Sequence, residues 1–166
     1  MTARGIHFAL TDDEVRALCA LREDERPSYL FGPLLEACSR VQPPLLAESD
    51  KAWDAMQRAL TDGTLDPEAG TYPLSRAIVG GESLCVSEHC IVSLKTPNDV
   101  RDIAQALDEL TEEEFRDRYF AINPRSYDGD IGEEDFEYTW SWLESVRDLF
   151  FHAAELGRAV VFAADQ

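Results

Sequence analysis

Six side chains form the best candidate set for chemistry in this sequence: His7, Asp50, Lys51, Trp53, Asp54 and Arg76. If they shared a pocket, Arg76 would bind a carboxylate or phosphate, Trp53 would form an apolar wall, and His7 would act as acid or base. The alternative interpretation is structural. Arg76 would then pair with Asp50 or Asp54, because buried charges are usually paired, and Trp53 would belong to the core. We favour the structural interpretation and keep the pocket as the alternative.

Two further motifs resemble metal sites, but their spacing does not fit one. Cys85, His89 and Cys90 could offer three zinc ligands, yet neighbouring side chains of an extended segment point to opposite sides. An EF-hand loop that began at Asp128 would need glycine at its sixth position, where this chain has Glu133. We therefore expect packed, reduced thiols at all four cysteines, Cys19, Cys38, Cys85 and Cys90. We also expect a solvated acidic loop, no metal and no cofactor.

The charge balance limits the classes of partner. The chain has 166 residues, and 33 Asp and Glu against 15 Lys and Arg give a formal charge of −18. Nucleic acids and anionic membranes are poor partners for such a surface, because both bind through lysine and arginine. After position 100, 17 acidic residues face 6 basic ones, a balance of −11. This excess favours a basic protein partner or serves solubility alone.

The remaining composition indicates one cytoplasmic domain. A length of 166 residues with 45% hydrophobic residues is enough for a single core, and we expect one domain over residues 1–166. No apolar run approaches the roughly 20 residues of a membrane span. The segment Met1 to Leu10 lacks the pattern of a signal peptide, so we expect a cytoplasmic protein.

Apolar periodicity and capping residues predict the main elements. Thr11 with Glu14 forms a capping box, Pro97 follows the cap residue Thr96, and Gly157 ends a long helix. For residues 74–79 both a strand and a single helical turn remain open. The expected helices start at Asp12 and run over Tyr29–Ser39, from Ser49 or Asp50 to Leu60, and over Thr96–Leu110, Thr111–Phe120 and Glu133–Leu156; the expected strands are Ile6–Leu10, Ile91–Leu94 and Ala159–Ala164.

This order of strands and helices predicts an α+β fold. We expect a small mixed or antiparallel sheet with several helices packed on it. The closing strand Ala159–Ala164 shows no polar alternation, which indicates that both of its faces are covered near the centre of the sheet.

Two segments also resemble the YfbM-like family of small bacterial proteins of unknown function. The first is Asp50-Lys51-Ala52-Trp53-Asp54 with Ala59-Leu60-Thr61 after it, and the second is Pro73-Leu74-Ser75-Arg76-Ala77-Ile78-Val79-Gly80 with Glu82-Ser83-Leu84 after it. The resemblance covers nearly the whole chain except Arg22–Glu48. It implies a compact α+β domain and a cytoplasmic bacterial protein, and it brings no reaction.

The best functional interpretation is a non-enzymatic acidic protein-interaction module, of the kind that immunity proteins exemplify. The alternative is a small-molecule binding protein or enzyme that uses a pocket near Arg76, Lys51, Trp53 and His7. A homo-oligomer built on the aromatic stripe of residues 136–151 is a further option.

Overall fold

The apolar run that closes the chain forms the central strand of the sheet. The computed structural model describes residues 4–165, and its strand β5 (Ala159–Asp165) is buried from Ala159 to Ala164. Within this described range, five strands form one sheet in the order β2-β1-β5-β4-β3. Every neighbouring pair is antiparallel, so the sheet is antiparallel rather than mixed. The protein is a compact single domain of the α+β class, as its pattern of elements predicts.

Four further strands flank β5. On one side β1 (Gly5–Leu10) pairs with β5, and β2 (Leu46–Asp50) forms the edge. On the other side β4 (Cys90–Lys95) pairs with β5, and β3 (Glu82–Ser87) forms the opposite edge. The sequence prediction of strands at β1, β4 and β5 is confirmed, whereas the two edge strands were missing from it.

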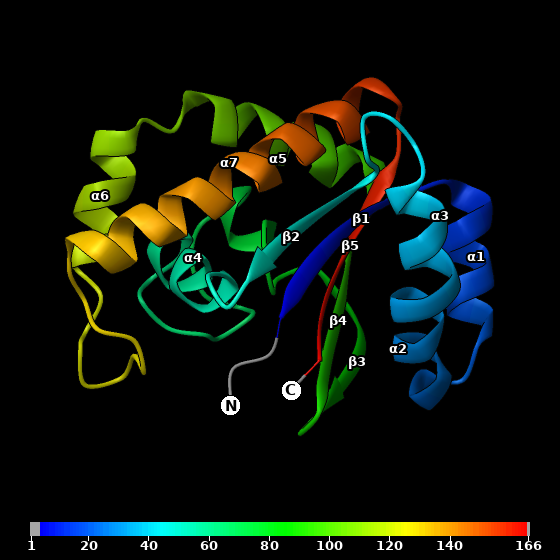
Figure 1. Ribbon diagram of the computed structural model, residues 1–166, viewed down its shortest axis with the longest axis horizontal. Coiled ribbons are helices and arrows are strands. Elements are labelled where there is room, and N and C mark those ends of the chain that lie inside the picture. The colour runs from blue at the N-terminus through cyan, green and yellow to red at the C-terminus, as the bar shows by residue number, and fades with distance from the viewer. Residues whose placement is uncertain (1–3, 166) are drawn as a thin grey trace.

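Helices cover both faces of the sheet, as Figure 1 shows. Helices α1, α2 and α3 lie on one side, and α4, α5, α6 and α7 lie on the other. Helix α7 packs against β1 and β2, while α5 packs against β4 and β5. The bounds are α1 Asp12–Ala20, α2 Arg26–Tyr29, α3 Leu35–Ser39, α4 Trp53–Leu60, α5 Pro97–Glu109, α6 Glu112–Phe120 and α7 Glu133–Glu155.

The predicted capping residues start and stop the helices. Thr11 accepts a hydrogen bond from the backbone N–H of Glu14, and Thr96 accepts one from Asp99. In both boxes the acidic side chain accepts in return from the backbone N–H of the cap residue. Gly157 follows α7 with a φ of 66°, a left-handed conformation that glycine adopts without strain.

Two local predictions need correction, and one open alternative is resolved. Neither Ser49 nor Asp50 caps α4, because both belong to β2 and the helix begins at Trp53. Of the strand and the helical turn left open for residues 74–79, the turn is confirmed, because residues 74–76 form a single 3-10 turn. The expected packing of all four thiols is wrong at Cys19, which lies on the exposed side of α1.

One apolar core joins the two helical layers to the sheet. Phe8 on β1 contacts Phe31 in the helical segment 30–34, which lies on the side of α1–α3. The neighbouring residue His7 points the other way, toward Phe150 on α7. This alternation follows from the period of two along a strand. None of the helices in residues 4–165 is long and apolar enough to cross a membrane.

Candidate functional site

A small hollow opens beside the turn that links β2 to α4, and we call it the tyrosine–aspartate hollow. Its volume is about 240 Å³. The β2–α4 turn, the loop 121–132 and the first turns of α7 surround it, so segments far apart in the chain meet there. The residues that line it are Lys51, Asp54, Tyr127, Asp128, Gly129, Asp135 and Tyr138.

Asp50 turns the chain from β2 toward α4 and brings Lys51 to the hollow. Asp50 has a φ of 44°, in the left-handed region that aspartate tolerates better than most residues. The phenol of Tyr138 on α7 donates a hydrogen bond of 2.6 Å to Oδ2 of Asp50. Burial and this carboxylate raise the pKa of Tyr138 to about 12. The phenol therefore stays protonated and holds the turn against α7.

Asp54 forms the buried wall of the hollow. Its Oδ1 atom accepts a hydrogen bond of 2.7 Å from Nε of Arg58 one helical turn later, and both side chains are about nine-tenths buried. Its Oδ2 atom has no hydrogen-bond partner among the described residues. Burial raises the pKa of Asp54, and the nearby carboxylates of Asp128 and Asp135 raise it further, while Arg58 opposes them.

Two phenols converge on the carboxylate of Asp135 at the start of α7. Tyr119 donates a hydrogen bond of 2.5 Å and Tyr127 one of 2.9 Å, both to Oδ2. Burial and this carboxylate raise the pKa of both tyrosines. Both phenols are therefore donors at neutral pH. Tyr119 ties α6 to α7, and Tyr127 ties the loop 121–132 to the same helix.

The structure places the other predicted site residues away from this hollow. His7 is fully buried between Phe150 and Phe162, and its Nε2 atom lies 2.9 Å from the carbonyl oxygen of Ala77. Burial, followed by the charge of Lys95, lowers the pKa of His7 to about 3. The ring is neutral and packed in the core, where it has no access to a substrate.

Arg76 has a different partner from the one the sequence analysis expected. It forms an ion pair of 3.1 Å with Asp99 on α5, not with Asp50 or Asp54. Its guanidinium also lies over the ring of Tyr72 at 5.4 Å. Arg76 thus forms an ion pair, as the structural interpretation predicts, but the predicted partners Asp50 and Asp54 are wrong.

Trp53 packs as the structural interpretation expects. Its side chain is buried against Phe162, with ring centroids 5.8 Å apart. A Cβ atom on Gly5 would lie only 2.8 Å from the Trp53 ring, which explains the glycine at that position of β1. Of the six predicted residues, the structure therefore brings Asp50, Lys51 and Asp54 together at the hollow, with Trp53 beneath them in the core.

Sequence reasoning missed Lys95, which is fully buried at the end of β4. Its ammonium group donates to the carbonyl oxygens of Ile78 and Gly80 at 2.6 and 2.7 Å, and to Oγ of Ser93 at 2.5 Å. Burial lowers the pKa of Lys95 well below its ordinary value. The chain has only one other lysine, Lys51. A lysine at the end of an apolar strand was therefore the feature of the sequence that could have indicated a special role for Lys95.

The cysteine segment does not assemble a metal site. Cys85 and Cys90 lie on the paired strands β3 and β4 and are both buried, whereas His89 is exposed. Burial, followed by the neighbouring Cys85, raises the pKa of Cys90 to about 12. Within residues 4–165, no three His, Cys, Asp or Glu side chains lie close enough to hold a metal ion.

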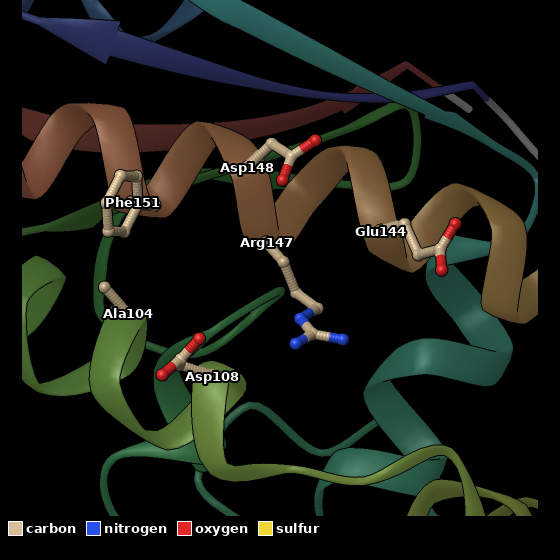
Figure 2. Close-up of a pocket in the computed structure, with 6 residues that line it drawn as sticks. All are labelled: Ala104, Asp108, Glu144, Arg147, Asp148 and Phe151. Carbon is tan, nitrogen blue, oxygen red and sulfur yellow. The ribbon is translucent and has the colours of Figure 1, made fainter.

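A second concavity lies between α5 and α7, and we call it the α5–α7 groove. The residues that line it come from α5 and α7, and the side chain of Arg147 extends into the groove (Figure 2). Its volume is about 330 Å³. Phe151 is 55% exposed, and the guanidinium of Arg147 lies 5.7 Å from the ring of Trp140. The residues that line the groove are Ala104, Asp108, Glu144, Arg147, Asp148 and Phe151.

The carboxylates of the groove are available to a partner. Asp108, Glu144 and Asp148 are exposed, and none of them forms an ion pair or hydrogen bond with another side chain in the described part of the chain. Three carboxylates against one arginine leave the lining with a formal charge of −2. Phe151 adds one exposed aromatic ring to this acidic rim.

The antiparallel sheet with helices on both faces makes this chain a protein of the α+β class. The chain belongs to the family described as "Domain of unknown function (DUF1877)", whose model matches residues 1–163. It is similar to the crystal structure of YfbM from Escherichia coli, a protein of unknown function, with a TM-score of 0.70 and 16% sequence identity. That similarity covers 97% of this chain and 99% of the YfbM chain. The predicted YfbM-like resemblance is confirmed, and at this identity the structural match shows the fold alone.

The search of the curated proteins found no match to this chain. The family description and the YfbM structure likewise carry no activity. The surface and the hollow of this chain are therefore the remaining guides to its function.

Proposed function

We propose that this protein is a non-enzymatic, cytoplasmic binding protein for a basic protein segment, and that the α5–α7 groove is its contact surface. The observation that carries the proposal is the exposed ring of Phe151 among the unpaired carboxylates of Asp108, Glu144 and Asp148. The occupant that fits is an amphipathic segment with an apolar residue against Phe151 and lysine or arginine against the rim.

The charge of the whole chain supports the same kind of partner. A formal charge of −18, concentrated after position 100, produces a negative potential that accelerates the approach of a basic protein. Contacts between exposed charges are screened by salt, so the association rate should fall as ionic strength rises. Salt does not screen the apolar contact with Phe151, so this contact provides the part of the affinity that remains at high ionic strength.

The composition of the groove also favours binding over catalysis. Its six lining residues include no nucleophile beside a base, and its arginine lies against an aromatic ring. A second copy of the chain is a poor occupant, because two acidic rims would repel each other. Mass measurement in solution tests that alternative, and a dimer lost in Phe151→Ala would contradict the proposed partner.

A titration with a defined peptide tests the proposal. The probe is a fluorescein-labelled amphipathic peptide with leucine on one face and lysine and arginine on the other, and fluorescence anisotropy gives the Kd. We expect the double variant Asp108→Asn, Asp148→Asn and the single variant Phe151→Ala each to weaken binding by about tenfold, which corresponds to about 1.4 kcal/mol.

A matched control separates a site from general charge attraction. Glu112→Gln with Glu113→Gln removes the same charge from the exposed first turn of α6, at two residues that do not line the groove. We expect the Kd of this control to stay within about twofold of the wild-type value. Equal losses in the control and the groove variant would overturn the proposal, because binding would then depend on net charge alone.

A further inference from the structure

We propose that Cys85 and Cys90 form a dithiol site that binds an organic arsenical, a trivalent arsenic atom with one apolar substituent and two replaceable hydroxyl groups. The two cysteines line a pocket between the end of the β3–β4 hairpin and the segment 23–27, and we call it the dithiol pocket. It lies on the face of the sheet that α1–α3 cover, whereas the α5–α7 groove lies on the other face (Figure 1). The proposal therefore goes beyond the proposed function and does not rest on it.

The β3–β4 ladder places both thiols on one face of the sheet. Cys85 lies opposite Val92, and Ser87 lies opposite Cys90, so the two cysteines are diagonal neighbours. Opposed residues, and residues two apart along a strand, point to the same face. Both cysteines are free, and their thiols hydrogen-bond each other. Two sulfur atoms in contact are the arrangement that a single bridging atom needs.

The dithiol pocket gives a bridging atom access and room. Cys85 and Cys90 are only 6% and 5% exposed, and the surface that they retain lines the pocket. The volume of the pocket is about 520 Å³, which lies within the range of small-ligand sites. Pro27 of α2 also lines it, so an apolar substituent on the arsenic atom has an apolar ring to contact.

Metal cations fit this pair of thiols less well. Within residues 4–165, no third His, Cys, Asp or Glu side chain completes a group that could hold a metal ion, and zinc needs more than two protein ligands. Metal cations also bind thiolates, so they must displace the thiol protons. Burial, followed by the thiol of Cys85, raises the pKa of Cys90 to about 12, which makes that loss costly at pH 7.

A disulfide between the two cysteines would require the strands to move. Diagonal neighbours have Cα atoms about 7–8 Å apart, whereas a disulfide spans at most about 7 Å. Disulfide formation also removes two electrons, which an oxidant must accept. An arsenic atom lies between the two sulfur atoms, so it bridges them at a separation that a direct sulfur–sulfur bond does not reach.

The reaction with an arsenical keeps the pocket uncharged. At each of the two hydroxyl groups an arsenic–oxygen bond breaks, an arsenic–sulfur bond forms, and the thiol proton leaves with the hydroxyl as water. The arsenic atom stays trivalent, so the step consumes no oxidant or reductant. No thiolate remains beside the carboxylates that also line the pocket, which belong to Glu23, Asp24 and Asp165. The bound state therefore avoids the cost of a buried negative charge.

Phenylarsine oxide, which water converts to the dihydroxy form, tests the site on the reduced full-length protein. We expect one equivalent to bind and to raise the intact mass by one phenylarsenic group less two hydrogen atoms. The bound protein is then unfolded and treated with iodoacetamide, and peptide mapping shows which thiols escape alkylation. We expect joint protection of Cys85 and Cys90, with Cys19 and Cys38 alkylated. Any other pattern of protection would overturn the site.

Variants test whether the two thiols act together. Competition with dithiothreitol gives the Kd for phenylarsine oxide. Cys90→Ala should weaken binding by about 100-fold or more, because the second arsenic–sulfur bond depends on the high effective concentration of a neighbouring thiol. Cys19→Ala and Cys38→Ala, at an exposed and a buried position, are the matched controls and should keep the Kd within about twofold. Equal binding by Cys90→Ala and the wild type would overturn the proposal, and the alkylation map of the wild type decides the outcome if the variant does not fold.

Two further measurements separate this reaction from metal binding and from simple thiol capture. Because no proton is released, the Kd should change by less than about threefold between pH 6 and pH 8, and a tenfold gain in affinity per pH unit would contradict the reaction. Arsenous acid offers the same reacting groups without an apolar substituent and should bind more weakly. Equal binding of arsenous acid would overturn the role of the pocket. Phe151→Ala should bind phenylarsine oxide as the wild type does, so failure of the groove proposal leaves this result interpretable.

Discussion

The ammonium nitrogen of Lys95 lies 2.6 Å from the carbonyl oxygen of Ile78, inside the core. This bond, with those to Gly80 and Ser93, ties the end of β4 to the segment 77–81 that follows Arg76. His7 holds the same segment from β1 through the carbonyl oxygen of Ala77. Both side chains therefore supply donors to buried carbonyl oxygens, of which that of Ile78 also accepts a hydrogen bond from Ser93.

Replacement of Lys95 tests this anchoring role. Lys95→Met keeps the apolar stem and removes the donor, so the carbonyl oxygens of Ile78 and Gly80 lose a buried partner. We expect the free energy of unfolding in urea to fall by about 1–3 kcal/mol. Lys51→Met, at the other lysine of the chain, should change it by less than about 0.5 kcal/mol because Lys51 is exposed. An equal effect of both substitutions would contradict the role of Lys95 in holding the segment 77–81.

Because His7 is buried in its neutral form, we expect the free energy of unfolding to fall in acid. Its folded-state pKa is about 3 against 6.5 for an ordinary histidine, so below pH 6.5 the unfolded chain binds a proton that the folded chain does not. This group should therefore remove about 2 kcal/mol of stability between pH 6.5 and pH 5. Stability in urea at several pH values measures the slope.

His7→Leu should flatten that slope between pH 6.5 and pH 5, although it lowers stability at pH 7 by leaving Ala77 without its partner. His89→Gln, at an exposed position, should keep the wild-type slope. A wild-type slope in His7→Leu would show that other groups cause the acid sensitivity.

The ion pair of Arg76 and Asp99 should affect stability over a lower pH range than His7 does. Burial raises the pKa of Asp99, but hydrogen bonds from Thr96 and the charge of Arg76 outweigh it and lower the pKa below 3.8. The stabilisation is therefore present above pH 3.8 and is lost as the pH falls through the folded-state value. Because Arg76 is half-exposed, we expect Arg76→Ala to cost about 0.5–1 kcal/mol at pH 7.

The difference between Arg76→Ala and the wild type should shrink below pH 3.8, as Asp99 becomes protonated in both proteins. Arg16→Ala removes the exposed pair with Asp13 and should have no measurable effect at any pH. A constant difference for Arg76→Ala down to the lowest pH would mean that packing against Tyr72, not the charge, carries its contribution.

The strands that sequence reasoning missed are the two edges of the sheet. The burial of β5 on both faces leaves an uninterrupted apolar run, whereas β2 is half-covered and contains Glu48 and Ser49 among its five residues. Edge strands pair on one side only and tolerate polar residues, so their pattern is weak. Capping boxes, in contrast, involve residues only three positions apart. Those at Thr11 and Thr96 could therefore be predicted from the sequence alone.

In the hollow, too, the sequence analysis found the residues that are close in sequence and missed those that only the fold brings near. Lys51 and Asp54 stood out because they lie within one short segment beside Trp53. Their partners Tyr127 and Tyr138 come from a loop and a helix more than seventy positions later, and only the tertiary fold brings them together. Arg76 likewise pairs with Asp99, and no local pattern favours that residue over Asp50 or Asp54.

Chemical-shift mapping with the amphipathic basic peptide tests the central claim of an acidic contact surface most directly. In amide spectra of the wild-type protein, we predict that the largest shifts on titration occur at Ala104, Asp108, Asp148 and Phe151, and that Phe151→Ala needs about tenfold more peptide to reach half of the maximal shift. Shifts spread evenly over all exposed acidic helices, or centred on the first turn of α6, would contradict the claim.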